Sequence, residues 1–142
     1  MKLKRFSRIF LLIGGILGYV YGACLALCAV VFYVLATPMV IEPLKEAIAD
    51  GRINGPEGAS PEVAVTAVQI IFLTTAIILT IWVVLCFLSA VFAFKARNQG
   101  DKKSYILNMV FGLISGTEFN VAGGILGYIA ETKRKPNVID AE

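Results

Sequence analysis

The chain has 142 residues, of which 58% are hydrophobic and 16% are charged, and its formal net charge is +3 without any histidine. Residues 9–36 and 63–94 carry no charge, and residues 104–130 carry only Glu118. These segments hold 87 of the 142 residues, and each exceeds the about 20 apolar residues that a membrane-spanning helix needs. The composition therefore excludes a soluble globular enzyme and a disordered protein. It predicts one integral membrane domain over residues 1–142.

The first apolar segment predicts a helix over residues 6–36. It follows a basic stretch and is longer than the roughly 7–15 apolar residues of a cleaved signal peptide. Tyr21-Gly22-Ala23-Cys24 is similar to a lipoprotein cleavage box, in which a cysteine follows small residues. The sequence after Cys24 is again membrane-like rather than a polar tether, so an uncleaved helix is favoured over lipoprotein processing.

The loop 37–59 contains one amphipathic pattern. Ile41, Leu44 and Ile48 recur at helical spacing, with charged residues between them. Gly51 follows as a suitable helix end. The pattern predicts a short amphipathic helix on the extracytoplasmic membrane surface.

The second long helix is predicted over residues 60–97. Ser60 is a good capping residue, Pro61 suits the first helical position, and Glu62 places an acid in the first turn. Gly100 is expected to end the helix. Its length exceeds the thickness of a bilayer, so we expect it to tilt or to project from the membrane.

The third segment, 104–130, allows two interpretations. A hairpin of two short helices, 102–116 and 119–133, places Glu118 and Asn120 at its tip, where turn-forming residues gather. A single crossing instead places the Glu118 carboxylate inside the bilayer, at a cost of roughly 2.5–3.5 kcal/mol. The hairpin is favoured, although each arm is short for a full crossing. Glu118 and Asn120 form a candidate polar site in either case.

Basic residues are distributed unevenly and predict the topology. The loop 37–62 carries five acidic and only two basic residues, whereas 11 of the 13 basic residues lie in three other segments. Lysine and arginine near span ends favour the cytoplasmic side. We therefore expect an inner-membrane protein with cytoplasmic termini and an extracytoplasmic loop 37–59. The topology-determining residues are Lys2, Lys4, Arg5, Arg8, Lys95, Arg97, Lys102, Lys103, Lys133, Arg134 and Lys135.

Glycines repeat at intervals of four within the apolar segments. Such rows allow close approach of another helix, which matters in lipid because the hydrophobic effect does not drive helix association there. These faces are expected to build the protein's own helix bundle. The alternative is that the first row, Gly14, Gly18 and Gly22, forms a homodimer or contacts a partner. The helix-packing positions are Gly14, Gly18, Gly22, Gly112, Gly116, Gly123 and Gly127.

Residues for catalysis are few. Cys24, Cys28 and Cys86 lie in apolar segments, and without histidine they do not make a metal site, so we expect small packing residues. The Thr and Gln residues of the second helix are expected to bond to backbone rather than to line a pathway. No paired carboxylates, nucleophile–base pair or phosphate loop is present. The sequence predicts no enzyme activity, no cofactor, no metal and no nucleic-acid partner.

The chain resembles the small bacterial four-helix membrane proteins grouped as domain of unknown function 4064. The motifs that carry the resemblance are Phe-Ala-Phe-Lys-Ala-Arg-Asn at 92–98, Gly-Leu-Ile-Ser-Gly at 112–116 and Ala-Gly-Gly-Ile-Leu-Gly-Tyr-Ile-Ala at 122–130. The similarity covers nearly the whole chain, most clearly residues 60–135. It implies four helices with both termini inside, and it supplies no catalytic residue.

The fold predicted is an all-α, integral membrane four-helix bundle with an additional surface helix. Besides the lipid bilayer, its expected partners are a second copy or a larger membrane protein. We expect a non-catalytic accessory or structural protein that acts through helix–helix contacts. The alternatives are a small oligomeric pore or holin-like protein, and a transporter subunit or sensor that uses the outer loop.

Overall fold

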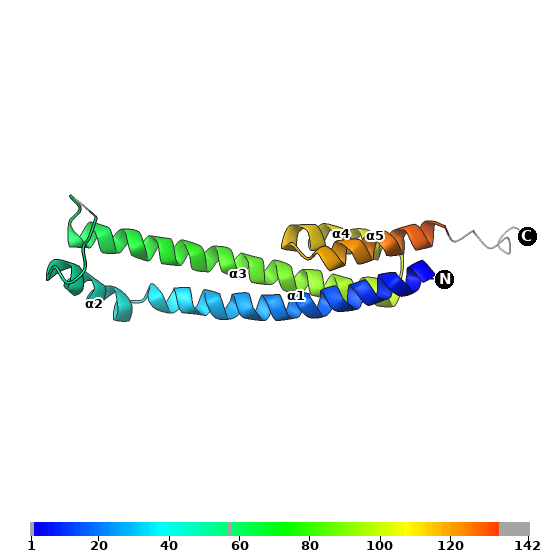
Figure 1. Ribbon diagram of the computed structural model, residues 1–142, viewed down its shortest axis with the longest axis horizontal. Helices are drawn as coiled ribbons and strands as arrows, with labels where there is room; N and C mark the ends of the chain where they lie inside the picture. The colour runs from blue at the N-terminus through cyan, green and yellow to red at the C-terminus, as the bar shows by residue number, and fades with distance from the viewer. Residues whose placement is uncertain (1, 57, 134–142) are drawn as a thin grey trace, which may run out of the picture. The chain divides into compact units, whose positions relative to one another are not determined.

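The computed structural model describes residues 2–56 and 58–133, and this part of the chain is all-helical, without strands (Figure 1). Two long helices are joined by a short helix and a loop, and a pair of short helices follows. The elements are α1 (Lys2–Leu35), α2 (Pro38–Ala49), α3 (Pro61–Gln99), α4 (Lys102–Ser115) and α5 (Glu118–Thr132). The all-α prediction is confirmed.

Helix α1 begins at Lys2, four residues before the predicted start. Lysine, leucine and arginine are good helix formers, and no breaker separates them from the apolar segment. Lys2, Lys4 and Arg5 therefore belong to the helix as well.

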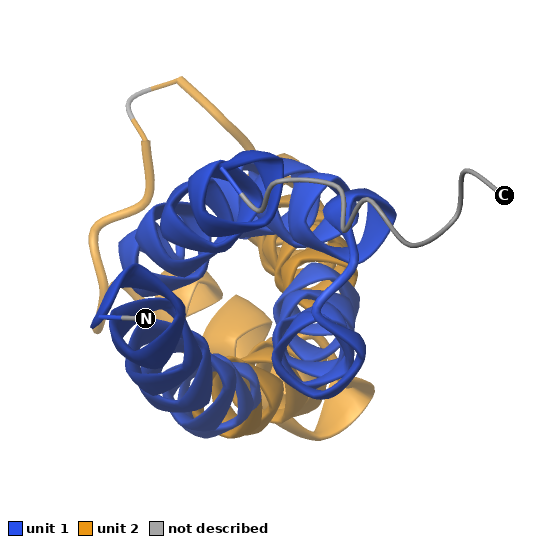
Figure 2. Ribbon diagram, turned by 90° about the vertical axis from the view of Figure 1, so that its right-hand side faces the viewer, with its two compact units in different colours: residues 1–22, 83–142 blue, residues 23–82 orange. Residues whose placement is uncertain are grey.

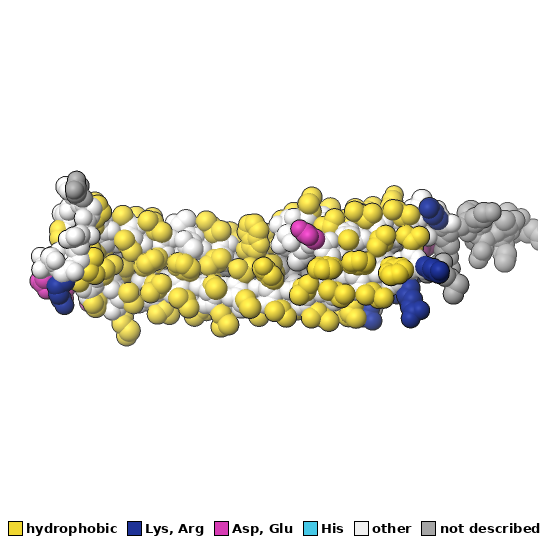
Figure 3. Space-filling view, in the orientation of Figure 1, with side chains coloured by type: hydrophobic (Ala, Val, Ile, Leu, Met, Phe, Trp, Pro, Cys, Tyr) yellow, Lys and Arg dark blue, Asp and Glu magenta, His cyan; other side chains and the backbone are white. Residues whose placement is uncertain are grey.

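Helices α1 and α3 are long and apolar enough to cross a membrane. They contain 34 and 39 residues, and only 22% of the residues in the apolar stretch of each helix are buried inside the protein. Figure 3 shows hydrophobic side chains over most of the visible helical surface.

The chain divides into two compact units, residues 1–22 with 83–142 and residues 23–82 (Figure 2). The second unit, 23–82, contains the end of α1, all of α2 and the beginning of α3. Gln69 donates a 3.0 Å hydrogen bond to the carbonyl of Ala36, and the rings of Phe32 and Phe72 lie 6.0 Å apart. These contacts join the two long helices next to the connecting segment.

Helix α2 has the apolar face that the sequence predicted, with Ile41 buried. It ends at Ala49, and Gly51 then adopts the left-handed conformation with φ of 70°. The Arg52 N–H donates to the Ala47 carbonyl at 2.9 Å, which completes the glycine-terminated helix end expected there.

The first unit, 1–22 with 83–142, contains α4 and α5 as an antiparallel hairpin against the start of α1 and the end of α3. Gly100, with φ of 65°, makes the turn between α3 and α4. Leu11, Ala93, Ala96 and Tyr105 form its buried apolar core.

Candidate functional site

Several buried polar side chains of the first unit meet at the tip of the hairpin, around Asn120. Asn120 lies in the first turn of α5 and is fully buried. Its amide nitrogen donates to Ser89 Oγ of α3 at 2.8 Å and to Thr117 Oγ1 at 3.1 Å. One side chain thereby ties the hairpin to α3.

The hydroxyl groups around Asn120 also bond to one another. Ser89 Oγ and Thr117 Oγ1 are 3.0 Å apart, and Ser115 Oγ and Thr117 Oγ1 are 2.9 Å apart. Asn108 of α4 donates from its amide nitrogen to the backbone carbonyl of Asn120 at 2.6 Å. We call Ser89, Asn108, Ser115, Thr117 and Asn120 the tip network. It is enclosed by helices and connects α3, α4 and α5.

Gly14 brings α1 against this network. A Cβ at position 14 would overlap Asn120 Oδ1 and would lie 2.9 Å from the Asn120 backbone nitrogen. Only glycine therefore lets α1 approach α5 this closely. Asn120 Oδ1 and Asn108 Oδ1 are both buried and accept no hydrogen bond from the residues that the structure describes.

The other glycines of α1 face α3. Gly18 lies against Ala90, with 3.1 Å between a Cβ built on the glycine and the Ala90 Cβ, and Gly22 lies against the Phe87 ring at 3.3 Å. All three glycines of the first row therefore contact helices of the same chain.

The glycines of the hairpin pack in three directions. Gly112 of α4 lies against Asn120 and Val121 of α5, and Gly123 lies against Leu11 of α1. Gly127 lies under the ring of Tyr105, which a Cβ would overlap. Ser7 of α1 donates to the Gly123 carbonyl at 2.7 Å, so α1 and α5 are bonded as well as closely packed.

Gly116 is the exception among the seven glycines, and the packing role expected for it is wrong. It has φ of 73° and ends α4, and nothing lies within 4 Å of a Cβ built there. The Thr117 N–H donates to the Gly112 carbonyl at 2.9 Å, as in a glycine-terminated helix end. Gly116 serves the turn between the two arms.

Glu118 and Asn120, expected together as one polar site, occupy different environments. Glu118 begins α5 and is exposed, and it makes no ion pair with any other residue that the structure describes. It lines a cavity of about 390 Å³ beside the tip, together with Gly14, Leu17, Tyr21, Ser115–Thr117 and Phe119. The cavity is mainly apolar, and Glu118 is its one charged group.

Among residues 2–56 and 58–133, no group of three or more Cys, Asp or Glu side chains is arranged so that it could hold a metal ion. Cys24 and Cys28 are exposed and Cys86 is buried, all as free thiols. Thr75 and Thr80 donate to backbone carbonyls of their own helix at 2.8 Å.

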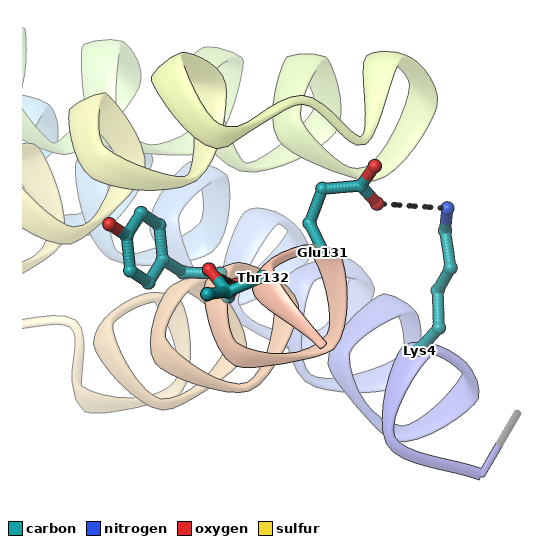
Figure 4. A network of polar contacts seen from close by, with 4 residues as sticks. Lys4, Glu131 and Thr132 are labelled. Atoms are coloured by element: carbon teal, nitrogen blue, oxygen red, sulfur yellow. Dashed lines mark hydrogen bonds and ion pairs between the residues drawn. The ribbon is translucent and has the colours of Figure 1, made fainter. Parts of the chain in front are cut away.

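Basic side chains gather where α1 begins and α5 ends (Figure 3). Lys4 Nζ and the Glu131 carboxylate form an ion pair at 3.4 Å (Figure 4). The Thr132 hydroxyl donates to the Tyr128 carbonyl at 2.9 Å. Lys2, Arg5, Arg8, Lys95, Lys102, Lys103 and Lys133 are exposed, and Arg97 is half-buried. Arg134 and Lys135 lie outside the described residues.

Five buried residues of this unit that carry a polar side-chain group were not singled out by the sequence. They are Ser7, Ser89, Ser104, Tyr105 and Asn108. A polar residue inside an apolar segment could have indicated them. From the sequence, such residues were considered only in the second helix and in the turn at 115–120. Which of these residues meet depends on packing between helices, which has no local sequence pattern.

Comparison with family models, with curated proteins and with solved structures gives no match to this chain. The resemblance to the four-helix membrane proteins therefore remains a prediction that depends on the short motifs at 92–98, 112–116 and 122–130.

Proposed function

We propose that the chain is an integral membrane protein whose helices α1 and α3 cross the bilayer, with both termini in the cytoplasm. Its role is non-catalytic: it is an accessory or structural protein that contacts a larger membrane protein. The two helices extend about 51 and 58 Å at 1.5 Å per residue, enough for the about 30 Å hydrocarbon core. The charge asymmetry between loop 37–62 and the basic ends supports this orientation.

The hairpin α4–α5 is proposed to enter from the cytoplasmic side and to turn back inside the membrane. Its arms have 14 and 15 residues, or about 21–23 Å, which is too short for a full crossing. The cavity beside its tip reaches Leu17 and Tyr21 of α1, which lie roughly 14–20 Å along the helix from Arg8. These lengths support a position of Glu118 near mid-membrane, at the tip of a hairpin that does not reach the extracytoplasmic surface.

One observation carries the accessory role: Glu118 is exposed beside a mainly apolar cavity and has no ion pair within the part of the chain that the structure describes. A carboxylate facing lipid at this depth is costly, and charged groups in membranes usually pair or line water-filled spaces. The tip network does not pair with the Glu118 carboxylate, because its members bond to one another. A donor or cation from a partner's helix, inserted in the cavity, would compensate the charge.

Photo-crosslinking in native membranes tests this role. A benzophenone side chain at Phe119, which lines the cavity, is expected to capture one larger membrane protein. The matched control is Ile125, on the same helix and similarly exposed (45% against 42%), which is expected to capture lipid. Glu118→Gln should weaken the capture at Phe119. Lipid adducts alone at both positions would contradict the proposal.

The pore alternative and the accessory role predict different ion fluxes for the purified protein. A pore would release ions from liposomes without a partner, whereas the accessory role predicts no flux above that of empty liposomes. The glycines that would build an oligomer face, Gly14, Gly18 and Gly22, already contact α3 and α5 of the same chain. This packing favours the accessory role over a glycine-mediated oligomer.

A further inference from the structure

A second cavity of the first unit lies between the start of α1 and the end of α3. Its volume is about 470 Å³, and its lining consists of Arg5, Arg8, Ile9 and Leu12 from α1 with Arg97 and Asn98 from α3. Arg5 and Arg8 are three residues apart, so they share one face of α1. Arg97 reaches the same cavity from α3, and it is the half-buried member of the three.

The described lining of this cavity holds three guanidinium groups and no carboxylate. Lys4, one residue before Arg5, pairs with Glu131 at 3.4 Å. The ion pairs found over residues 2–56 and 58–133 include none of the three arginines. Three positive charges around one cavity whose described lining holds no carboxylate produce a local positive potential that attracts an anion.

The chemistry of the lining specifies the anion. Arginine forks form paired hydrogen bonds with phosphate oxygens, and they do so more specifically than lysine. Asn98 adds an amide that can donate to an oxygen. Ile9 and Leu12 give the cavity an apolar side, which inorganic phosphate does not need but a glycerol–acyl group does.

We propose that Arg5, Arg8 and Arg97 form a binding site for the phosphate group of one anionic phospholipid, with its acyl chains against Ile9 and Leu12. The site builds on the proposed membrane topology, because it then lies where the cytoplasmic leaflet presents its headgroups. It is distinct from the Glu118 cavity, and it gives three of the topology-determining arginines a specific ligand.

Native mass spectrometry of the full chain in mild detergent tests the site, with phosphatidylglycerol as the probe and phosphatidylcholine as its zwitterionic counterpart. One phosphatidylglycerol is expected to bind in preference to phosphatidylcholine. Arg97→Gln should weaken that binding roughly tenfold, the loss expected for hydrogen bonds to a charged group. Arg97→Lys keeps the charge but loses the fork, and it should also weaken binding severalfold. Lys103→Gln removes one exposed charge outside the cavity and should change binding less than twofold.

Three results would overturn the proposal. Equal weakening by Arg97→Gln and Lys103→Gln would mean that only net charge matters. Equal binding of the two lipids would remove the selectivity for an anionic headgroup. Displacement of the lipid by millimolar inorganic phosphate would mean that the site takes free phosphate instead. Because binding is measured in detergent, with melting curves to check that each variant is folded, a failure here is separate from a failure of the topology.

Discussion

Replacing Gly14 by alanine tests the contact between α1 and the tip network. The new Cβ would overlap Asn120 Oδ1 and would lie 2.8 Å from Asn120 Cγ. The Asn120 side chain cannot turn away without losing its hydrogen bonds to Ser89 and Thr117. Helix α1 must therefore move outward, or the tip network must break.

The cost follows from these contacts. Overpacking costs about 1–3 kcal/mol, and each hydrogen bond lost in a membrane protein adds about 0.6 kcal/mol. The higher helix propensity of alanine offsets about 1 kcal/mol of this loss in stability. We expect Gly14→Ala to lower the free energy of unfolding by about 1–3 kcal/mol. Gly22→Ala, whose Cβ would meet only a Phe87 ring at 3.3 Å, should be near neutral or stabilising.

Reversible unfolding in mixed detergent micelles, followed by circular dichroism, measures both variants. In the Asn120→Ala background, Gly14→Ala should cost about 1 kcal/mol less than alone, because the overlapping amide is gone. Some cost should persist, since the Asn120 backbone nitrogen lies 2.9 Å from the new Cβ. If Gly14→Ala cost no more than Gly22→Ala, the close packing of α1 on the tip network would be refuted.

Two further predictions concern the turn of the hairpin and the outer loop. Gly116→Ala should lower the free energy of unfolding by about 1–2 kcal/mol, because φ of 73° strains a residue with a Cβ. Gly116→Asn should lower it less. Equal stability of the wild-type protein and both variants in the same unfolding assay would contradict the role of Gly116 in the turn. The pKa of Glu62 lies below its ordinary 4.5, first because Lys45 donates a 2.7 Å hydrogen bond to it and then because of the Lys45 charge. The pair therefore stabilises the fold above pH 4.5, and this small contribution is lost as the pH falls through the lower folded-state pKa. In Lys45→Gln the pKa of Glu62 should rise toward its ordinary value in an NMR titration, and an unchanged pKa would mean that the pair does not form in solution.

Local signals were sufficient for several helix boundaries, although not for the start of α1. Ser60 and Pro61 preceded the apolar run of α3, and the helix begins at Pro61. Gly51 and Gly100 were expected as helix ends, and both have positive φ. These features depend on residues close in sequence, so capping and turn preferences predict them.

Contacts between helices were harder to predict from the sequence. The rows of small residues indicated close packing, but they did not reveal that Gly14 meets Asn120 while Gly18 meets Ala90. Asn108 is 12 residues from Asn120 and lay inside an apolar segment without any pattern around it. Gly116 had the spacing of a packing residue, yet its backbone conformation assigns it to the turn. Spacing alone does not distinguish these roles, because both require glycine.

Thiol labelling in intact cells tests most directly the proposal that α4–α5 turns back inside the membrane. Single cysteines at Ala59, Leu113 and Asn137 are placed in a variant whose Cys24, Cys28 and Cys86 are alanine. Asn137 lies outside the described residues, and Leu113 is exposed near the hairpin tip. A membrane-impermeant maleimide should label the cysteine at 59 and neither of the others. Labelling at 113 would mean that the hairpin reaches the outer surface, and labelling at 137 would mean that residues 104–130 cross once; either result would contradict the topology proposed.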